Sequence, residues 1–373
     1  MRLMVTAGGT GGHISPAVAV IEELQQRDPR LVVRWVGRRK GLEARMCETL
    51  SIPFRSVPVE GWPRAHAWRK PWAAAKLAAG AALALAHIRR FRPQVVLGMG
   101  GYVSVPLMWV AQRLGAPTVL HEQNKRLGLA NRILAKRAHR LLLSYPETIG
   151  EFPRERSRVV GNPVRAGFSR APDPAAARAK LGFEPDRPLV LFVGGSQGAR
   201  TLNQAVTESL QLLEPGTVQI LWMTGGADVA EARLAAEAAP VAVHAVAFID
   251  DMVTACTAPD IIVSRAGASS TAEIATLGKP SLLVPYPYAA DNHQEENARA
   301  FEAAGAAIVL KDDQCSGTRL TQVLKGLLDD RSRLEHMAAA ARTLAKPGAA
   351  ETIADEILAL AFEEARPGNR PAL

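Results

Sequence analysis

The chain has 373 residues, of which 45 are Lys or Arg and 36 are Asp or Glu. A hydrophobic fraction of 48% with 22% charge is typical of a folded globular protein and excludes disordered and collagen-like chains. Cys47, Cys256 and Cys315 lie far apart, which excludes a disulfide scaffold, argues against a zinc site and favours a reducing compartment. Aromatic residues make up only 5%, which argues against a stacking surface for single-stranded nucleic acid.

The charge is unevenly distributed along the chain. Residues 1–163 carry a net charge of +16 and residues 164–373 carry −7, which together give the overall +9. This division favours an anionic partner that contacts the first half only, with nucleic acid and an anionic membrane as the generic candidates. Colloidal solubility is the alternative explanation.

Short apolar runs alternate with glycine turns and helical stretches along the first half. We predict strands at residues 3–7, 31–36, 95–97, 118–120 and 141–143. Ser15 and Pro16 have the residue types of an N-cap and a first helical position, so we expect the first helix to start there. Continuous apolar strands with helices between them predict a parallel sheet covered on both faces.

The rhythm breaks at the proline-rich segment 161–187 and then restarts. We predict further strands at residues 189–193, 218–222, 243–246, 261–263 and 281–284, and a C-terminal helix from about residue 349. The prediction is therefore an α/β protein of two doubly wound domains, residues 1–162 and 163–348. The helix at 349–365 is expected to pack back on the first domain.

No segment has the sequence pattern of a membrane-spanning helix. The longest stretch without charged residues or histidine, 93–112, is interrupted by three glycines and by Pro106, and the apolar run 77–85 is short. A spanning helix needs about 20 predominantly apolar residues. We therefore expect a protein without a transmembrane span, located in the cytoplasm.

Four glycine-rich turns follow predicted strands and precede predicted helices. Glycines allow a ligand to approach the backbone, and a helix N-terminus favours negative charge. The first of these turns has neither the spacing of a dinucleotide fingerprint nor that of a P-loop. Simple tight turning is the alternative, but four such turns fit an extended ligand that contains a diphosphate. The turns are 8–12, 98–101, 194–198 and 265–268.

Polar residues cluster at other predicted strand ends and at the domain junction. These clusters are 121–124, 162–165 and 291–294. His13 has an alternative role in hydrogen bonding within its turn, and Glu273 could form a capping box with Ser270. No Asp-x-Asp pair is present to chelate a divalent ion. A departing diphosphate would therefore be met by N–H groups, helix N-termini and Arg165.

Taken together, these motifs resemble the MurG-type N-acetylglucosaminyltransferases of peptidoglycan synthesis, which convert lipid I to lipid II. The resemblance runs from Gly8 to about Gly348, with all motifs in family order. They are GGTGGH at 8–13, GMGGYVS at 98–104, HEQN at 121–124, GNPVR at 161–165, GGSQGAR at 194–200, FIDDM at 248–252, SRAGA at 264–268 and DNHQ at 291–294. Each motif alone is weak evidence, and their joint occurrence is specific.

The resemblance implies a GT-B fold, with UDP-N-acetylglucosamine held mainly by the second domain and a lipid I acceptor at the first. It implies an inverting transfer to the muramyl 4-hydroxyl, with His13 and Glu122 facing the acceptor. We expect one of these two residues to be the base, with His13 favoured because an imidazole pKa lies near working pH, and we expect no cofactor or metal. The implied donor contacts are Thr10, Gly11, Gly12, Asn124, Arg165, Ser196, Ile249, Ala268, Ser269, Ser270, Thr271, Ala272, Glu273, His293 and Gln294. The implied acceptor diphosphate contacts are Gly100, Gly101, Tyr102 and Ser104.

A lipid acceptor gives a reason for the basic first half. Tryptophans at 62, 68 and 72 are interleaved with Lys and Arg over residues 62–92, and Trp109 is nearby in sequence, which suits an anionic membrane interface. The alternative is that the tryptophans are core residues. We expect a peripheral protein on the cytoplasmic face of the inner membrane, with other cell-wall synthesis proteins as candidate partners and no nucleic acid.

One departure from the family and three rival functions remain. Lys125-Arg126-Leu127 stands where the family has small residues, which affects the details of acceptor recognition. A UDP-N-acetylglucosamine 2-epimerase would share the donor contacts but needs no lipid-facing surface. An NADP-dependent reductase is suggested only by Arg38-Arg39, and a membrane-docked scaffold without catalysis is the third rival.

Overall fold

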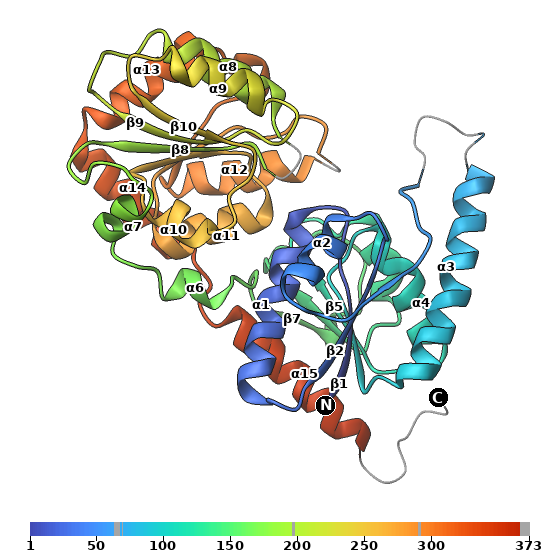
Figure 1. Cartoon of the computed structure of the whole chain (residues 1–373). Coiled ribbons are helices and arrows are strands. Elements are labelled where there is room, and N and C mark those ends of the chain that lie inside the picture. The colour runs from blue at the N-terminus through green and yellow to red at the C-terminus, as the bar shows by residue number, and fades with distance from the viewer. Residues whose placement is uncertain (63–67, 69, 196–197, 290–291, 366–373) are drawn as a thin grey trace. The chain divides into compact units, whose positions relative to one another are not determined.

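The computed structural model describes residues 1–62, 68, 70–195, 198–289 and 292–365. The chain divides into two compact units, each built on its own parallel sheet (Figure 1). Unit 1 contains Met1–Ala166 and the chain from Gly348 onward, and unit 2 contains Gly167–Pro347. The helix α15 (Ala349–Ala365) therefore belongs to unit 1 although it follows unit 2 in sequence.

The sheet of unit 1 has seven parallel strands in the order β3-β2-β1-β4-β5-β6-β7. The predicted strands are all present, and the two edge strands β3 and β7 were not predicted. Both are three residues long and carry exposed positions, so they lack the continuous apolar run of the inner strands. The strands are β1 (Arg2–Thr6), β2 (Val32–Gly37), β3 (Phe54–Ser56), β4 (Val95–Gly98), β5 (Thr118–Glu122), β6 (Arg140–Leu143) and β7 (Ser157–Val159).

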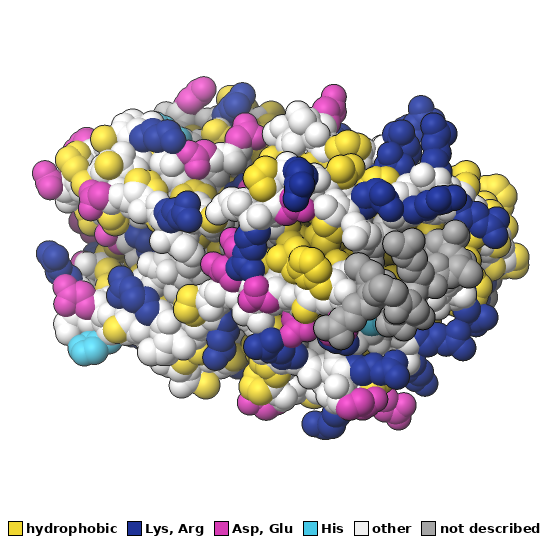
Figure 2. All heavy atoms as spheres, turned by 90° about the horizontal axis from the view of Figure 1, so that it is seen from below, with side chains coloured by type: hydrophobic (Ala, Val, Ile, Leu, Met, Phe, Trp, Pro, Cys, Tyr) yellow, Lys and Arg dark blue, Asp and Glu magenta, His cyan; other side chains and the backbone are white. Residues whose placement is uncertain are grey.

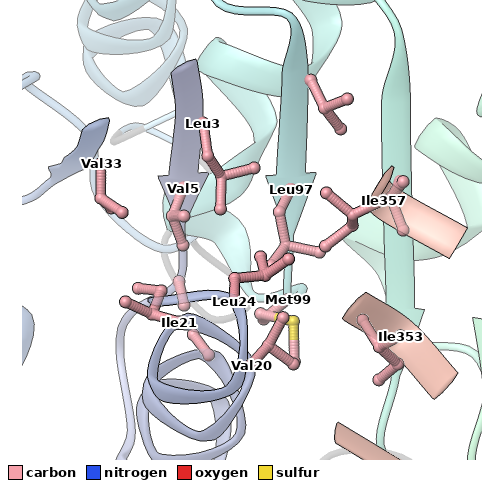
Figure 3. Packing of buried hydrophobic residues seen from close by; sticks show 14 of the residues in the cluster. Leu3, Val5, Val20, Ile21, Leu24, Val33, Leu97, Met99, Ile353 and Ile357 are labelled. Atoms are coloured by element: carbon pink, nitrogen blue, oxygen red, sulfur yellow. The ribbon is translucent and has the colours of Figure 1, made fainter. Parts of the chain in front are cut away.

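The side chains of each inner strand alternate between two buried faces. Leu3 and Val5 of β1 point to one face, where α1 (Gly11–Arg27) and α15 pack together (Figure 3). Ile353 and Ile357 of α15 are fully buried in this cluster. Because α15 supplies part of the core, the last helix is held to unit 1 by burial of apolar surface.

The opposite face is covered by α3 (Lys70–Phe91), α4 (Val105–Arg113) and α5 (Leu129–Ala135). Among the described helices, α3 alone is long and apolar enough to cross a membrane by length and composition. It is longer than the apolar run 77–85 led us to expect. Ala84, Ile88 and Phe91 from its C-terminal half pack into the core of unit 1.

Unit 2 repeats the architecture with six parallel strands in the order β10-β9-β8-β11-β12-β13. The short edge strand β13 was not predicted. The strands are β8 (Leu189–Val193), β9 (Gln219–Met223), β10 (Ala242–Val246), β11 (Ile261–Ser264), β12 (Ser281–Leu283) and β13 (Ala307–Val309). The helices are α6 (Ala166–Ser169), α7 (Pro174–Lys180), α8 (Arg200–Leu210), α9 (Val229–Glu237), α10 (Met252–Thr257), α11 (Ala268–Leu277), α12 (His293–Ala303), α13 (Gly317–Leu328) and α14 (Arg331–Leu344).

The strand orders locate the point where each sheet reverses its winding direction. In unit 1 this switch point lies between β1 and β4, and in unit 2 between β8 and β11. Ligands of open α/β sheets bind at the carboxyl ends of the strands at such points. The four predicted glycine turns follow these four strands, so the fold places a pair of them at each switch point.

Candidate active site

The two glycine turns of unit 1 touch one another. Gly101 has a φ of +75°, and a Cβ at this position would lie 2.9 Å from the carbonyl oxygen of Gly8 and 3.6 Å from the imidazole of His13. A side chain at Gly101 would therefore clash with the first loop as well as strain its own backbone. Glycine is required here because two loops contact each other, and the need for a tight turn is not the only reason for it.

The first loop is held from several sides. The indole of Trp35 donates to the carbonyl of Ala7 at 3.1 Å, and the ring of Tyr102 lies beside Gly9. Nδ1 of His13 and the hydroxyl of Thr10 are 3.0 Å apart. Thr10 is exposed and His13 is partly exposed, so both side chains can be reached by a ligand.

The predicted start of the first helix at Ser15 and Pro16 is wrong. The helix α1 begins at Gly11, with Thr10 as the N-cap, so Pro16 lies inside it. Pro16 falls in the second turn, where it removes a single backbone hydrogen bond. As a result Gly11, Gly12 and His13 form the first turn of α1, directly after β1 at the switch point. The N-terminus of a helix favours an anion, so this turn is a candidate anion site.

Glu122, at the end of β5, is almost completely buried and accepts four hydrogen bonds. Its Oε1 accepts from the backbone and side-chain nitrogens of Asn124 at 3.0 and 3.2 Å. Its Oε2 accepts from the backbone of Gly128 at 3.0 Å and from the amide of Asn131 at 2.8 Å. Burial raises the pKa of Glu122, while these donors act to lower it. The carboxylate is thus enclosed by donors and organises the loop from residue 124 to 128.

His121 is fully buried beside Glu122 in a defined tautomer. Its Nε2 lies 3.0 Å from the carbonyl of Gly161, and its Nδ1 lies 3.0 Å from the amide nitrogen of Gln123. A carbonyl can only accept, so Nε2 carries the proton and Nδ1 accepts. Burial lowers the pKa of His121 to about 4, which keeps the ring neutral. Gln123 also donates to the carbonyl of Met99 at 2.9 Å, so this chain of bonds ties the second glycine loop to the GNPVR segment.

The four predicted acceptor contacts differ in accessibility. Gly101 and Tyr102 are partly exposed, whereas Gly100 and Ser104 are buried. The hydroxyl of Ser104 donates to the carbonyl of Gly101 at 2.7 Å. Ser104 therefore shapes the loop, and its contact with a diphosphate stays a prediction.

The switch point of unit 2 lies between the turns after β8 and β11. Gly198 has a φ of +79°, and a Cβ there would lie 2.8 Å from the carbonyl of Thr224. Because of this close approach, the turn after β8 packs against the end of β9. The predicted diphosphate contact Ser196 lies outside the described residues.

The turn after β11 opens α11, whose N-cap is Gly267. Ser270 therefore lies inside the helix, and the capping box considered for Ser270 and Glu273 does not form. Ala268, Ser269 and Ser270 form the first turn of α11, so their N–H groups lie at the positive end of the helix dipole. Thr271 is buried with its hydroxyl on the carbonyls of Gly267 and Ala268, so it supports the turn.

The remaining predicted donor contacts are distributed over both units. Ile249 is buried in the loop after β10, and Glu273 is partly exposed on α11. On α12, Oε1 of Gln294 accepts from the backbone of Tyr286 at 3.0 Å, next to the partly exposed His293. Arg165 belongs to unit 1, where its charge acts against the rise in pKa that burial causes at Glu22 of α1.

Asn131 is a site residue that sequence reasoning missed. Its amide nitrogen bridges Oε2 of Glu122 and the carbonyl of His121, the latter at 3.1 Å, and it is buried. No motif marked it, because its role depends on the helix α5 folding back over the end of β5.

Comparison with known proteins bears on both units. The family model described as the glycosyltransferase family 28 N-terminal domain matches residues 3–143, and the one described as its C-terminal domain matches residues 189–353. The UDP-N-acetylglucosamine--N-acetylmuramyl-(pentapeptide) pyrophosphoryl-undecaprenol N-acetylglucosamine transferase of Nitratidesulfovibrio vulgaris is 41% identical over 361 residues, covering 96% of this chain and 97% of that protein. Its counterpart in Alkalilimnicola ehrlichii is 42% identical over 372 residues, covering 98% and 99%.

Solved structures agree with the sequence relatives. The crystal structure of Acinetobacter baumannii MurG superposes with a TM-score of 0.74 at 30% identity, covering 96% of this chain and 99% of that one. A putative UDP-N-acetylglucosamine 2-epimerase from Listeria monocytogenes has a TM-score of 0.68 at 15% identity over 98% of both chains, which is a likeness of fold alone. The predicted GT-B fold is confirmed, and the chain belongs to glycosyltransferase family 28, among the MurG-type N-acetylglucosaminyltransferases.

Proposed function

We propose that this protein transfers N-acetylglucosamine from UDP-N-acetylglucosamine to the 4-hydroxyl of the muramyl sugar of lipid I, which gives lipid II. The observation that carries this function is identity of about two residues in five, over nearly the whole chain, to transferases of that name. The epimerase alternative is supported only by a likeness of fold. The alternative of an NADP-dependent reductase is weakened by the missing dinucleotide fingerprint and by membership of glycosyltransferase family 28. Incubation with radiolabelled donor and a lipid I analogue tests the function, because only a transferase yields a labelled lipid.

The reaction is a single displacement at the anomeric carbon. The 4-hydroxyl oxygen attacks this carbon, the bond to the β-phosphate oxygen breaks, and UDP leaves with the electron pair. Two things are needed from the protein: a base for the hydroxyl proton and stabilisation of the diphosphate.

His13 is the better candidate for the base. In the tautomer in which Nδ1–H donates a hydrogen bond to the hydroxyl oxygen of Thr10, Nε2 carries the lone pair that can accept a proton. The carboxylate of Glu122 accepts four hydrogen bonds and is buried, so a proton on it would displace a donor. We assign Glu122 to positioning the loop that carries Asn124. If His13→Ala lowered kcat less than about tenfold, His13 would not be the base.

The donor is assigned mainly to unit 2. The N–H groups at Ala268, Ser269 and Ser270, at the positive end of α11, suit the diphosphate. Glu273 is assigned to the ribose hydroxyls, the backbone of Ile249 to the uracil edge, and Gln294 with His293 to the sugar hydroxyls. Thr10, Gly11, Gly12, Asn124 and Arg165 are assigned to the donor from unit 1. A donor-bound crystal structure with UDP away from Ile249 and Glu273 would contradict these assignments.

An anionic membrane surface is proposed as the partner of unit 1. Trp68 is 78% exposed, and Trp62 and Trp72 are at least half exposed, which argues against the core alternative. The ammonium of Lys76 lies 5.3 Å from the centre of the Trp72 ring. Figure 1 shows α3 at the right-hand end of the molecule. At the same end, Figure 2 shows Lys and Arg side chains with hydrophobic side chains among them. Arg64 and Arg69 lie outside the described residues.

Aromatic residues at the headgroup level and cations near the surface both favour binding to anionic lipid. The proposed location is the cytoplasmic face of the inner membrane, where lipid I is the acceptor. Co-sedimentation with phosphatidylglycerol vesicles tests it. Trp72→Ser is expected to weaken binding and Leu212→Ser, on an exposed position of unit 2, to leave it unchanged. Binding that did not weaken with salt would contradict the electrostatic part.

A further inference from the structure

Glu43 is a buried carboxylate that the motifs did not single out. It lies in the first turn of α2 (Leu42–Thr49) and is 0% exposed. Its Oε1 accepts from the backbone N–H of Arg38 at 2.9 Å. Its Oε2 is buried and has no hydrogen-bond partner among the described residues. Burial of a carboxylate costs free energy, which the helix N-terminus and one hydrogen bond offset only in part.

Three glycines pack against this one side chain. A Cβ at Gly8 would lie 2.7 Å from the carboxyl carbon and from Oε1 of Glu43. A Cβ at Gly37, the last residue of β2, would lie 2.7 Å from its Cγ, and one at Gly41 would also overlap the carboxylate. Cβ atoms do not approach so closely in proteins, so the loops after β1 and β2 are built around Glu43.

The contact at Gly8 connects Glu43 to the candidate base. Gly8 lies between two neighbours: the carboxylate of Glu43 on one side and Gly101 on the other. The space that a Cβ of Gly101 would fill is bounded by the carbonyl of Gly8 and by the imidazole of His13. A displacement of Gly8 therefore changes the packing around His13 and the loop that leads to Thr10.

We propose that Glu43 is a positioning residue for the transfer reaction, which acts by fixing Gly8 and, through it, the imidazole of His13. This inference rests on the proposed function, in which His13 is the base. The carboxylate does not touch the substrates. Its role is to fix the position of the first glycine loop. This position matters because a displacement of about 1 Å in a reacting group can reduce the rate about 100-fold.

The test measures kcat for Glu43→Gln in the wild-type and His13→Ala backgrounds, with UDP-N-acetylglucosamine and a water-soluble lipid I analogue. Glu43→Gln keeps the shape of the side chain and is expected to lower kcat about 10- to 100-fold in the wild-type background. In the His13→Ala background the loss should fall below about threefold, because residues that act as a unit are not additive. The matched control is Glu48→Gln, an exposed residue of the same helix, which should leave kcat unchanged.

A merely structural role would give the same fold-loss in both backgrounds, and that result overturns the proposal, as does an unchanged kcat in Glu43→Gln. A loss of less than about tenfold in His13→Ala alone would instead overturn the base assignment. Gly8→Ala is the second variant if Glu43→Gln does not fold. It retains Glu43 but pushes its carboxylate away, and it should show the same dependence on His13.

Discussion

Replacement of Glu122 by glutamine separates a structural carboxylate from a catalytic base. The carboxylate accepts two hydrogen bonds at each oxygen. Whichever way the new amide is turned, its NH2 group would face two N–H donors. Two hydrogen bonds to a charged acceptor are then lost, each contributing about 1.5–3 kcal/mol, so the free energy of unfolding should fall by about 3–6 kcal/mol.

For a unit of this size about 1 kcal/mol corresponds to about 2–4 °C, so the Tm of unit 1 should fall by at least about 6 °C. Circular dichroism of Glu122→Gln, with the exposed Glu147→Gln as control, measures this shift. The pH dependence of kcat should keep its acid limb, because that limb belongs to His13 in our assignment. An unchanged Tm together with a 100-fold loss of kcat and a lost acid limb would refute the structural reading of Glu122.

Three further predictions concern stability and the leaving group. Burial lowers the pKa of His121 to about 4 in the folded chain, against about 6.5 in the unfolded chain, so the unfolded chain takes up the proton first as the pH falls. About 3 kcal/mol of the free energy of unfolding should therefore be lost between pH 6.5 and pH 4. Urea titrations of His121→Gln should show a smaller loss of the free energy of unfolding over this pH range. Ile357→Ala removes a fully buried side chain of α15 and should cost unit 1 about 2–5 kcal/mol, whereas a cost below about 1 kcal/mol would mean that α15 is loosely attached. If amides of α11 and Arg165 neutralise the departing diphosphate, turnover should persist in EDTA, and its loss with recovery on adding magnesium would contradict that assignment.

Much of the fold was predictable from the sequence because its signals are local. The inner strands are continuous apolar runs, and the glycine turns and helix starts follow them directly. The edge strands β3 and β7 were missed, since three residues with exposed or partly exposed positions give no such run. The edge strand β13 was missed although Ala307–Val309 is apolar, because a run of three residues does not by itself distinguish a strand from part of a helix. The start of α1 was misplaced because Pro16 suggested a first turn, whereas α1 begins at Gly11 and holds Pro16 in its second turn.

The candidate site was only partly predictable. The sequence by itself determined which residues carry ionisable and hydrogen-bonding groups, and it placed the glycine turns at strand ends. Only the tertiary structure decided what those groups can do. It showed Glu122 enclosed by four donors, Ser104 donating to the carbonyl of Gly101, and Glu43 buried beneath Gly8. The physical reason is that the availability of a carboxylate or hydroxyl depends on its desolvation and its partners, which come from segments brought together by folding.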